Sequence, residues 1–140
     1  MVKKYCAYYI KQINDYVAKR ANNELREYDL TLAQHTVLMI LYGSPEKRAS
    51  MKSLEHELAV AQSTTAGIVE RLSQKGLVVK LDSAEDRRIK FVQITPQGIQ
   101  ACEKTNLDVE AGEDFLFGCL TGQERKTLQE LLKKVCKNIE

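Results

Sequence analysis

The amino-acid sequence predicts a mainly α-helical fold with one small β-hairpin, and three observations within residues 50–95 lead to that prediction. Apolar and small side chains first recur at spacings of three and four residues, as in helices that bury one side: Leu54, Leu58, Thr65, Ile68 and Leu72. Gly76 then ends the second helix, because glycine enters the left-handed backbone region without a steric penalty. Alternation with a period near two follows in LVVKL and IKFVQIT, which indicates two strands joined by a charged loop. A helix-turn-helix followed by such a hairpin is a winged helix-turn-helix.

The beginning of the chain predicts one long amphipathic helix. Its apolar stripe recurs at helical intervals between polar positions: Tyr5, Cys6, Tyr9, Ile13, Tyr16, Val17, Ala21, Leu25 and Tyr28. Because a small domain cannot cover so long a helix by itself, we expect part of the stripe to meet a partner subunit. The alternative is a face that packs within the chain.

The next two helices have recognisable ends. Thr31 and Gln34 have the spacing of a capping box, so the second helix is expected to start there and to end at Gly43-Ser44-Pro45. The segment from Pro45 to Ala49 is expected to be a short basic loop. Ser50 is a suitable N-cap for a third helix that ends at Leu58.

Two further helices follow the hairpin. Thr95 is expected to cap the fifth helix, with Pro96 in the favoured first position. Thr121 and Glu124 form a second capping box, which predicts a final helix that runs to the end of the sequence. Its apolar positions recur at helical spacing: Leu128, Leu131, Leu132, Val135 and Ile139.

Composition limits the possible functions. The 140 residues are 44% hydrophobic and 29% charged, with a net charge of +2, as in an ordinary soluble domain. No apolar run approaches the roughly 20 residues that cross a bilayer, so we expect a cytoplasmic protein without a membrane partner. The four cysteines lie far apart and no histidine completes a metal set, so no metal or other cofactor is expected. Nothing in the sequence suggests an enzyme. We find no glycine-rich phosphate loop, no paired carboxylates in an apolar setting and no nucleophile with an evident base.

Several short motifs then occur in a characteristic order. They are Leu30-Thr31-Leu32-Ala33-Gln34, Ser63-Thr64, Arg71-Leu72, Lys75-Gly76-Leu77-Val78, Asp86-Arg87-Arg88 and Ile94-Thr95-x-x-Gly98. In this order and spacing the chain closely resembles the MarR family of bacterial transcription regulators. The resemblance implies a single domain over residues 1–140, in which 30–95 form the DNA-binding winged helix-turn-helix. Residues 1–29 and 96–140 would be dimerisation helices.

The resemblance also implies which residues contact DNA. A recognition helix that enters the major groove needs short polar side chains at its leading end, and Gln62, Ser63 and Thr64 meet that need. Gly67 and Arg71 are expected on the same outward face, where Arg71 could reach a phosphate or a guanine edge. The turn has Ala59 and Ala61 where the family usually has Gly and a capping Ser or Asp, so Ser63 is expected to supply the cap instead.

The loop of the hairpin is the second expected contact with DNA. In the family, an Asp-x-Arg pattern, here Asp86 and Arg88, places the arginine in the minor groove while the aspartate orients it. Arg87 and Lys90 would then contact phosphates. Without the family resemblance, a solvated hairpin tip would be the simpler interpretation of the same charges.

The main functional hypothesis is a homodimeric repressor that leaves a pseudo-palindromic operator in double-stranded DNA when a small-molecule inducer binds. Candidates to line the inducer pocket are Tyr9, Tyr16, His35 and Met39, although tyrosines at helical spacing also fit a packing role. One alternative is a thiol-based redox regulator that uses Cys6, against a buried and inert thiol at that position. Another alternative is a winged helix that contacts proteins and has no DNA target.

Overall fold

The computed structural model describes residues 2–140, apart from the side chain of Leu107, as two compact units, Met1–Asn106 and Leu107–Glu140. Met1 belongs to the predicted range 1–29 but lies outside the described residues. The first unit holds the elements α1 to α4 and three strands, and helix α5 (Pro96–Phe117) continues from the first unit into the second. In the described part of the chain, no helix is both long enough and apolar enough to cross a membrane.

Helices α1 (Cys6–Glu27) and α2 (Leu32–Gly43) begin and end close to the predicted positions. The capping box at the start of α2 is complete. Thr31 Oγ1 accepts from the backbone N–H of Gln34 at 3.1 Å, and Gln34 Oε1 accepts from the backbone N–H of Thr31 at 3.2 Å. Both bonds satisfy N–H groups that have no partner inside the helix, which fixes where α2 starts.

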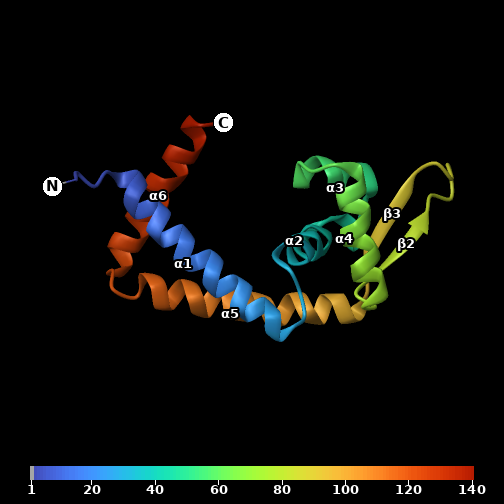
Figure 1. Ribbon diagram of the computed structural model, residues 1–140, viewed down its shortest axis with the longest axis horizontal. Coiled ribbons are helices and arrows are strands. Elements are labelled where there is room, and N and C mark those ends of the chain that lie inside the picture. Colours follow the sequence, from blue (N-terminus) through green and yellow to red (C-terminus); the bar gives the residue numbers. More distant parts are fainter. Residues whose placement is uncertain (1) are drawn as a thin grey trace. The chain divides into compact units, whose positions relative to one another are not determined.

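The helix-turn-helix consists of α3 (Met51–Leu58) and α4 (Gln62–Gln74), which Figure 1 shows side by side. The side chain of Ser50 caps α3 as predicted, because its Oγ accepts from the backbone N–H of Ser53 at 3.1 Å. Ala59 ends α3 in the left-handed region with φ of 54°. Alanine in place of glycine at this conformation costs on the order of 1 kcal/mol, and the tight turn forms despite that cost.

The sheet has three strands, one more than the sequence predicted. Strands β2 (Val78–Asp82) and β3 (Lys90–Ile94) form the expected hairpin, with Val78 opposite Ile94 and Lys80 opposite Val92. Residues 48 and 49 belong instead to a short strand, β1 (Arg48–Ser50), which pairs antiparallel with β3 in the order β1-β3-β2. The prediction of a loop from Pro45 to Ala49 was wrong there. Three residues are too few to show a period of two, and the pairing depends on the distant β3.

The core of the first unit lies where α2, α3, α4 and the sheet meet. Its fully buried side chains include Leu38 and Leu41 of α2, Leu54 of α3, Val69 and Leu72 of α4, Val78 of β2 and Val92 of β3. Leu54, Thr65 and Leu72 are buried as predicted, and Leu58 and Ile68 are partly buried. This packing leaves the opposite face of α4 open to solvent.

The start of α5 explains the motif Ile94-Thr95-x-x-Gly98, in which Thr95 and Gly98 stand one and four residues after the end of β3. Thr95 Oγ1 accepts from the Gly98 N–H at 3.1 Å and donates to the Gly76 carbonyl at 2.7 Å. A Cβ on Gly98 would lie 2.3 Å from the carbonyl oxygen of Leu77, so a side chain cannot fit there. Gly76 itself has φ of +76°, the left-handed conformation that the sequence predicted.

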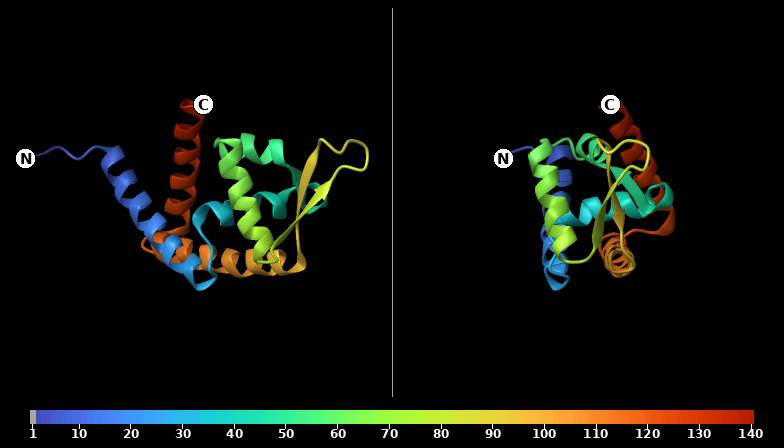
Figure 2. Two further views of the ribbon diagram at one scale, coloured as in Figure 1. Left: turned by 45° about the vertical axis from the view of Figure 1, so that its right-hand side comes forward. Right: turned by 90° about the vertical axis from the view of Figure 1, so that its right-hand side faces the viewer.

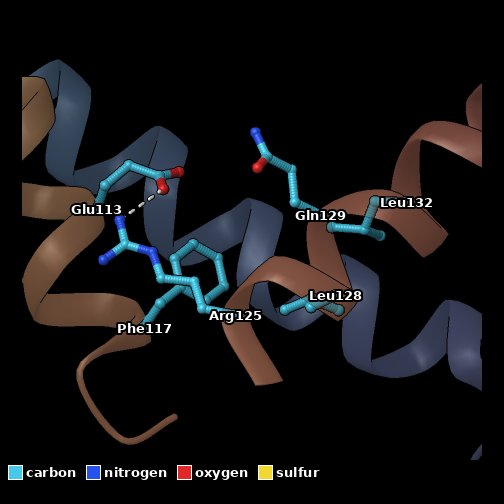
Figure 3. Close-up of a pocket in the computed structure, with 6 residues that line it drawn as sticks. All are labelled: Glu113, Phe117, Arg125, Leu128, Gln129 and Leu132. Carbon is cyan, nitrogen blue, oxygen red and sulfur yellow. Dashed lines mark hydrogen bonds and ion pairs between the residues drawn. The ribbon is translucent and has the colours of Figure 1, made fainter. Parts of the chain in front are cut away.

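The second unit is a helical hairpin of the end of α5 and helix α6 (Gly122–Asn138). The predicted capping box is complete, because Thr121 Oγ1 accepts from the Glu124 N–H at 3.2 Å and Glu124 Oε1 accepts from the Thr121 N–H at 2.9 Å. Arg125 joins the two helices through Asp114 at 3.0 Å and Glu113 at 3.3 Å. Figure 3 shows Arg125 and Glu113 at a cavity of about 200 Å³ whose apolar lining is Phe117, Leu128 and Leu132.

Candidate nucleic-acid interface

Helix α4 presents two different faces. Thr65, Val69 and Leu72 face the core and are fully buried. The predicted contact residues lie on the exposed side: Gln62, Ser63, Thr64, Gly67 and Arg71. A Cβ built on Gly67 would meet nothing within 4 Å, so nothing within the described chain requires glycine at that position. The exposed face therefore carries short polar side chains, a bare stretch of backbone and one arginine.

The N-terminus of α4 lacks a side-chain cap. The N-cap residue is Ala61, and helix α4 starts at Gln62, so the prediction that Ser63 supplies the cap was wrong. Ser63 lies inside the first turn, where its hydroxyl is too far along the helix to accept from the orphan N–H groups. Uncapped N–H groups and the positive end of the helix dipole together favour a phosphate or another anion.

The tip of the hairpin is held by hydrogen bonds between neighbouring residues. Ser83 Oγ accepts from the backbone N–H groups of Glu85 at 3.2 Å and Asp86 at 3.3 Å. Asp86 in turn accepts from the backbone N–H of Arg88 at 2.9 Å and from Nε and Nη2 of the same residue, each at 3.1 Å. These bonds lower the pKa of Asp86. The carboxylate thus holds the guanidinium in one orientation while the Arg88 side chain stays 90% exposed.

The positive charges of residues 62–90 differ in how they are compensated. Lys80 pairs with Glu70 of α4, and Lys90 pairs with Asp82 on the opposite strand of the hairpin. Both pairs are exposed and therefore weak, so phosphate can replace the carboxylate. Among the described residues, Arg71 and Arg87 have no ion-pair partner. Figure 2 shows the hairpin loop that carries Arg87 and Arg88 extending beyond the ends of β2 and β3.

A cavity of about 740 Å³ brings four of the predicted contact residues together. Gln62 from α4 and Asp86, Arg88 and Lys90 from the hairpin line it, along with residues from the start of α3 and others nearby: Ser50, Met51, Lys52, Glu55, Ala66 and Ile89. Lys52 is a cationic lining residue that the sequence analysis missed, although it follows the Ser50 cap by two positions. Arg71 lines a different cavity of about 700 Å³, with Arg26 and Lys75.

The residues predicted to line an inducer pocket lie in different surroundings. Tyr9 and Tyr16 are 51% and 40% exposed on α1, and Met39 packs partly buried against the core. His35 is half-buried, its Nε2 lies 3.0 Å from Oγ1 of Thr105, and burial lowers its pKa. None of the three cavities described above is lined by any of these four residues.

The cysteines also differ in their surroundings. Cys6 is exposed, so the expectation of a buried thiol at that position was wrong. Cys102 is fully buried on α5, and burial raises its pKa to about 11. In the part of the chain that the structure describes, no three metal-ligating side chains come together.

A helix-turn-helix with an open polar face, followed by a hairpin with an oriented arginine at its tip, defines a winged helix-turn-helix. Residues 28–89 match the model of the MarR family. The multiple antibiotic resistance protein MarR of Salmonella typhimurium is 30% identical over 129 residues, 90% of this chain and 87% of MarR. The regulator MhqR of Bacillus subtilis is 27% identical over 125 residues, 89% of this chain and 82% of MhqR. The chain belongs to the MarR family of transcription regulators.

Solved structures share the fold of this chain. The apo form of MarR from E. coli has a TM-score of 0.81 at 28% identity, covering 96% of this chain and 98% of MarR. MepR of S. aureus in a complex with DNA has the same TM-score at 21% identity, covering 97% of this chain and 99% of MepR. The family consists of DNA-binding transcription regulators, which are not enzymes.

Proposed function

We propose that this chain is a homodimeric repressor that acts in the cytoplasm and binds a pseudo-palindromic operator. Residues 30–95 form its DNA-binding part. The N-terminal half of α4, with Gln62, Ser63, Thr64 and Gly67, enters the major groove, and Arg71 follows further along the helix. Arg88 enters the adjacent minor groove from the hairpin tip, while Arg87 and Lys90 contact phosphates.

The observation that carries the proposal is the bidentate contact between Asp86 and Arg88. An exposed arginine ordinarily samples many rotamers, and a partner that binds it must order the side chain at a cost. Here the carboxylate has already oriented the guanidinium at 3.1 Å, with most of the side chain still accessible. Such an arrangement suits insertion into a narrow groove of negative potential.

The dimeric state is supported by apolar side chains on the flanking helices. On α1, Ile13 is 41% exposed and Val17 is 46% exposed, and on α6, Leu131 and Val135 are each 55% exposed. Large apolar side chains exposed at helical spacing along one helix favour a contact with another protein. We assign the contact to a second copy of this chain, because a dimer places two recognition helices on the two half-sites of a palindrome.

Release from DNA is proposed to follow the binding of a small-molecule inducer near Tyr9, Tyr16, His35 and Met39. One observation favours a second candidate signal. Cys6 is exposed, so its thiol is accessible to an oxidant in a way that the buried Cys102 is not. In that case peroxide would abolish DNA binding in a manner that thiols reverse, and Cys6→Ser would keep binding under oxidant.

The experiment that tests the function is selection of duplex DNA from a random library with the purified protein. We expect recovery of one sequence with two-fold symmetry, whose affinity for the protein falls steeply as salt is added. Recovery of no enriched sequence, together with binding that does not depend on salt, would contradict DNA binding and favour a module that contacts proteins.

A further inference from the structure

Lys75 lies in the proposed DNA-binding part, and its ammonium group makes hydrogen bonds to other residues of the chain. It is the C-cap residue of α4, at the opposite end of the recognition helix from the proposed base contacts. Its Nζ donates to Oε1 of Gln34 at 3.0 Å and to the backbone carbonyl of Asp29, and the Asp29 carboxylate lies 3.7 Å away. The Lys75 side chain is 29% exposed, so most of its surface is covered by neighbouring residues.

The two acceptors belong to the junction between α1 and α2. Asp29 lies in the turn that follows α1, with φ of 55°, and Gln34 is the third residue of α2. Gln34 is only 4% exposed, and its Oε1 already accepts the capping bond from Thr31. The ammonium of Lys75 therefore joins the end of the recognition helix to a rigid, buried cap.

We propose that Lys75 is a positioning residue that fixes the orientation of α4 relative to the junction between α1 and α2. This proposal rests on the proposed function, because α1 is assigned to the dimer contact and α4 to the DNA. The C-terminal end of α4 has a second attachment, where Thr95 Oγ1 donates to the carbonyl of Gly76 at 2.7 Å. With one attachment to α5 and one to the junction, the helix cannot pivot about its C-terminus.

The fold does not depend on this contact. When Lys75 loses its ammonium, Oε1 of Gln34 keeps the N–H of Thr31 as a donor, and the exposed turn at Asp29 lets water reach its carbonyl. A buried acceptor left without any donor would cost about 1–3 kcal/mol, and no such group results here. The apolar stem of a methionine can occupy the same space, so Lys75→Met is expected to fold.

The test compares Lys75→Met with Lys104→Met, a matched loss of one exposed lysine on α5. On the duplex selected by the wild-type protein, Lys75→Met should weaken binding about 10-fold, the scale of one hydrogen bond to a charged group. Its affinity for random duplex DNA and the slope of affinity against salt should equal those of Lys104→Met. Lys75→Arg should restore binding, because guanidinium also donates to two oxygens.

Two results would overturn the proposal. Weaker binding to every duplex with a salt slope reduced by about one charge would show that Lys75 contacts a phosphate. Unchanged affinity with a lower melting temperature would show a role in stability alone.

Amide hydrogen exchange tests the contact without DNA. Lys75→Met should speed exchange at Gly76 and Leu77, whose N–H groups donate to the carbonyls of Ser73 and Leu72. If the wild type selects no DNA but exchange changes, the proposed function fails while the attachment stands; if exchange does not change, the attachment itself fails.

Discussion

The winged helix and the helices that flank it in sequence bury their apolar side chains to very different degrees. Leu38, Leu54 and Leu72 in the winged helix are fully buried. Ile13 of α1 and Leu131 of α6 occupy similar positions in amphipathic helices, yet they are 41% and 55% exposed. The same amphipathic pattern thus gives a buried core where another element of the chain packs against the apolar side of the helix. Where no such element packs against it, the apolar side chains stay exposed. These exposed apolar side chains are the ones that the proposed second copy of the chain would cover.

Truncation of one leucine in each region is expected to have the largest effect. Leu54→Ala should lower the free energy of unfolding by about 2–5 kcal/mol at any protein concentration, because it leaves a cavity in a closed core. Leu131→Ala should instead lower stability by an amount that depends on concentration, since assembly contributes to the stability of a dimer. Denaturant unfolding at two protein concentrations distinguishes them. Equal, concentration-independent losses would show that α6 is packed within its own chain.

The next prediction concerns the hairpin tip, where we expect Asp86 to hold the exposed side chain of Arg88 in position. Arg88→Ala should weaken binding to every operator variant and reduce the salt slope by about one charge. If Asp86 acts by holding Arg88, Asp86→Ala should cause a similar loss, and the double variant should lose little more. Titrations of the three variants against one duplex provide the measurement. Tighter binding by Asp86→Ala would mean that the carboxylate only repels phosphate.

A substitution at Gly67 is expected to have opposite effects on the stability of the protein and on its binding to DNA. A Cβ meets nothing within 4 Å, and alanine favours a helix over glycine, so Gly67→Ala should stabilise the protein by about 0.5–1 kcal/mol. If DNA approaches the bare backbone there, the same variant should bind its operator more weakly. Thermal unfolding and DNA titration of one preparation measure both quantities. A gain in stability without loss of binding would remove Gly67 from the interface.

The smallest expected effect concerns His35 of α2, which is half-buried and lies beside Thr105 of the flanking helix α5. Thr105 Oγ1 lies 3.0 Å from His35 Nε2 and 3.0 Å from each of the carbonyls of Ala101 and Cys102, to which its hydroxyl can donate. Because the pKa of His35 is lowered in the folded state, the unfolded state binds more protons, and stability should fall as the pH drops below about 6.5. His35→Gln should make unfolding less dependent on pH between 7.5 and 5.5. An equal dependence in both proteins would place its cause in other groups.

Local sequence signals predicted most of the fold, and long-range contacts account for what they missed. Capping boxes at Thr31 and Thr121, the cap at Ser50 and the glycine at position 76 depend on neighbouring residues, and each was predicted. Strand β1 depends on pairing with β3, more than forty positions away, and it was missed.

Within the candidate site, the exposed face of α4 could likewise be predicted from spacing. The contact between Asp86 and Arg88 was implied by the family resemblance, since the residues alone favoured a solvated hairpin tip. The contacts of Lys75 with Asp29 and Gln34 could not, because a lysine after a helix gives no sign of the distant acceptors that it reaches. The uncapped end of α4 was also missed, since a serine in the first turn resembles a cap without being at the cap position.

The most direct test of the difference between the two regions is the mass of the protein in solution. Light scattering at micromolar concentration should give twice the 15.9 kDa of one chain for the wild type. Ile13→Glu, which places a charge on the exposed stripe of α1, should give the mass of one chain and lose binding to the operator, whereas Lys19→Glu on the polar side should remain dimeric. A wild-type protein with the mass of one chain that still binds a two-fold symmetric duplex would contradict the account.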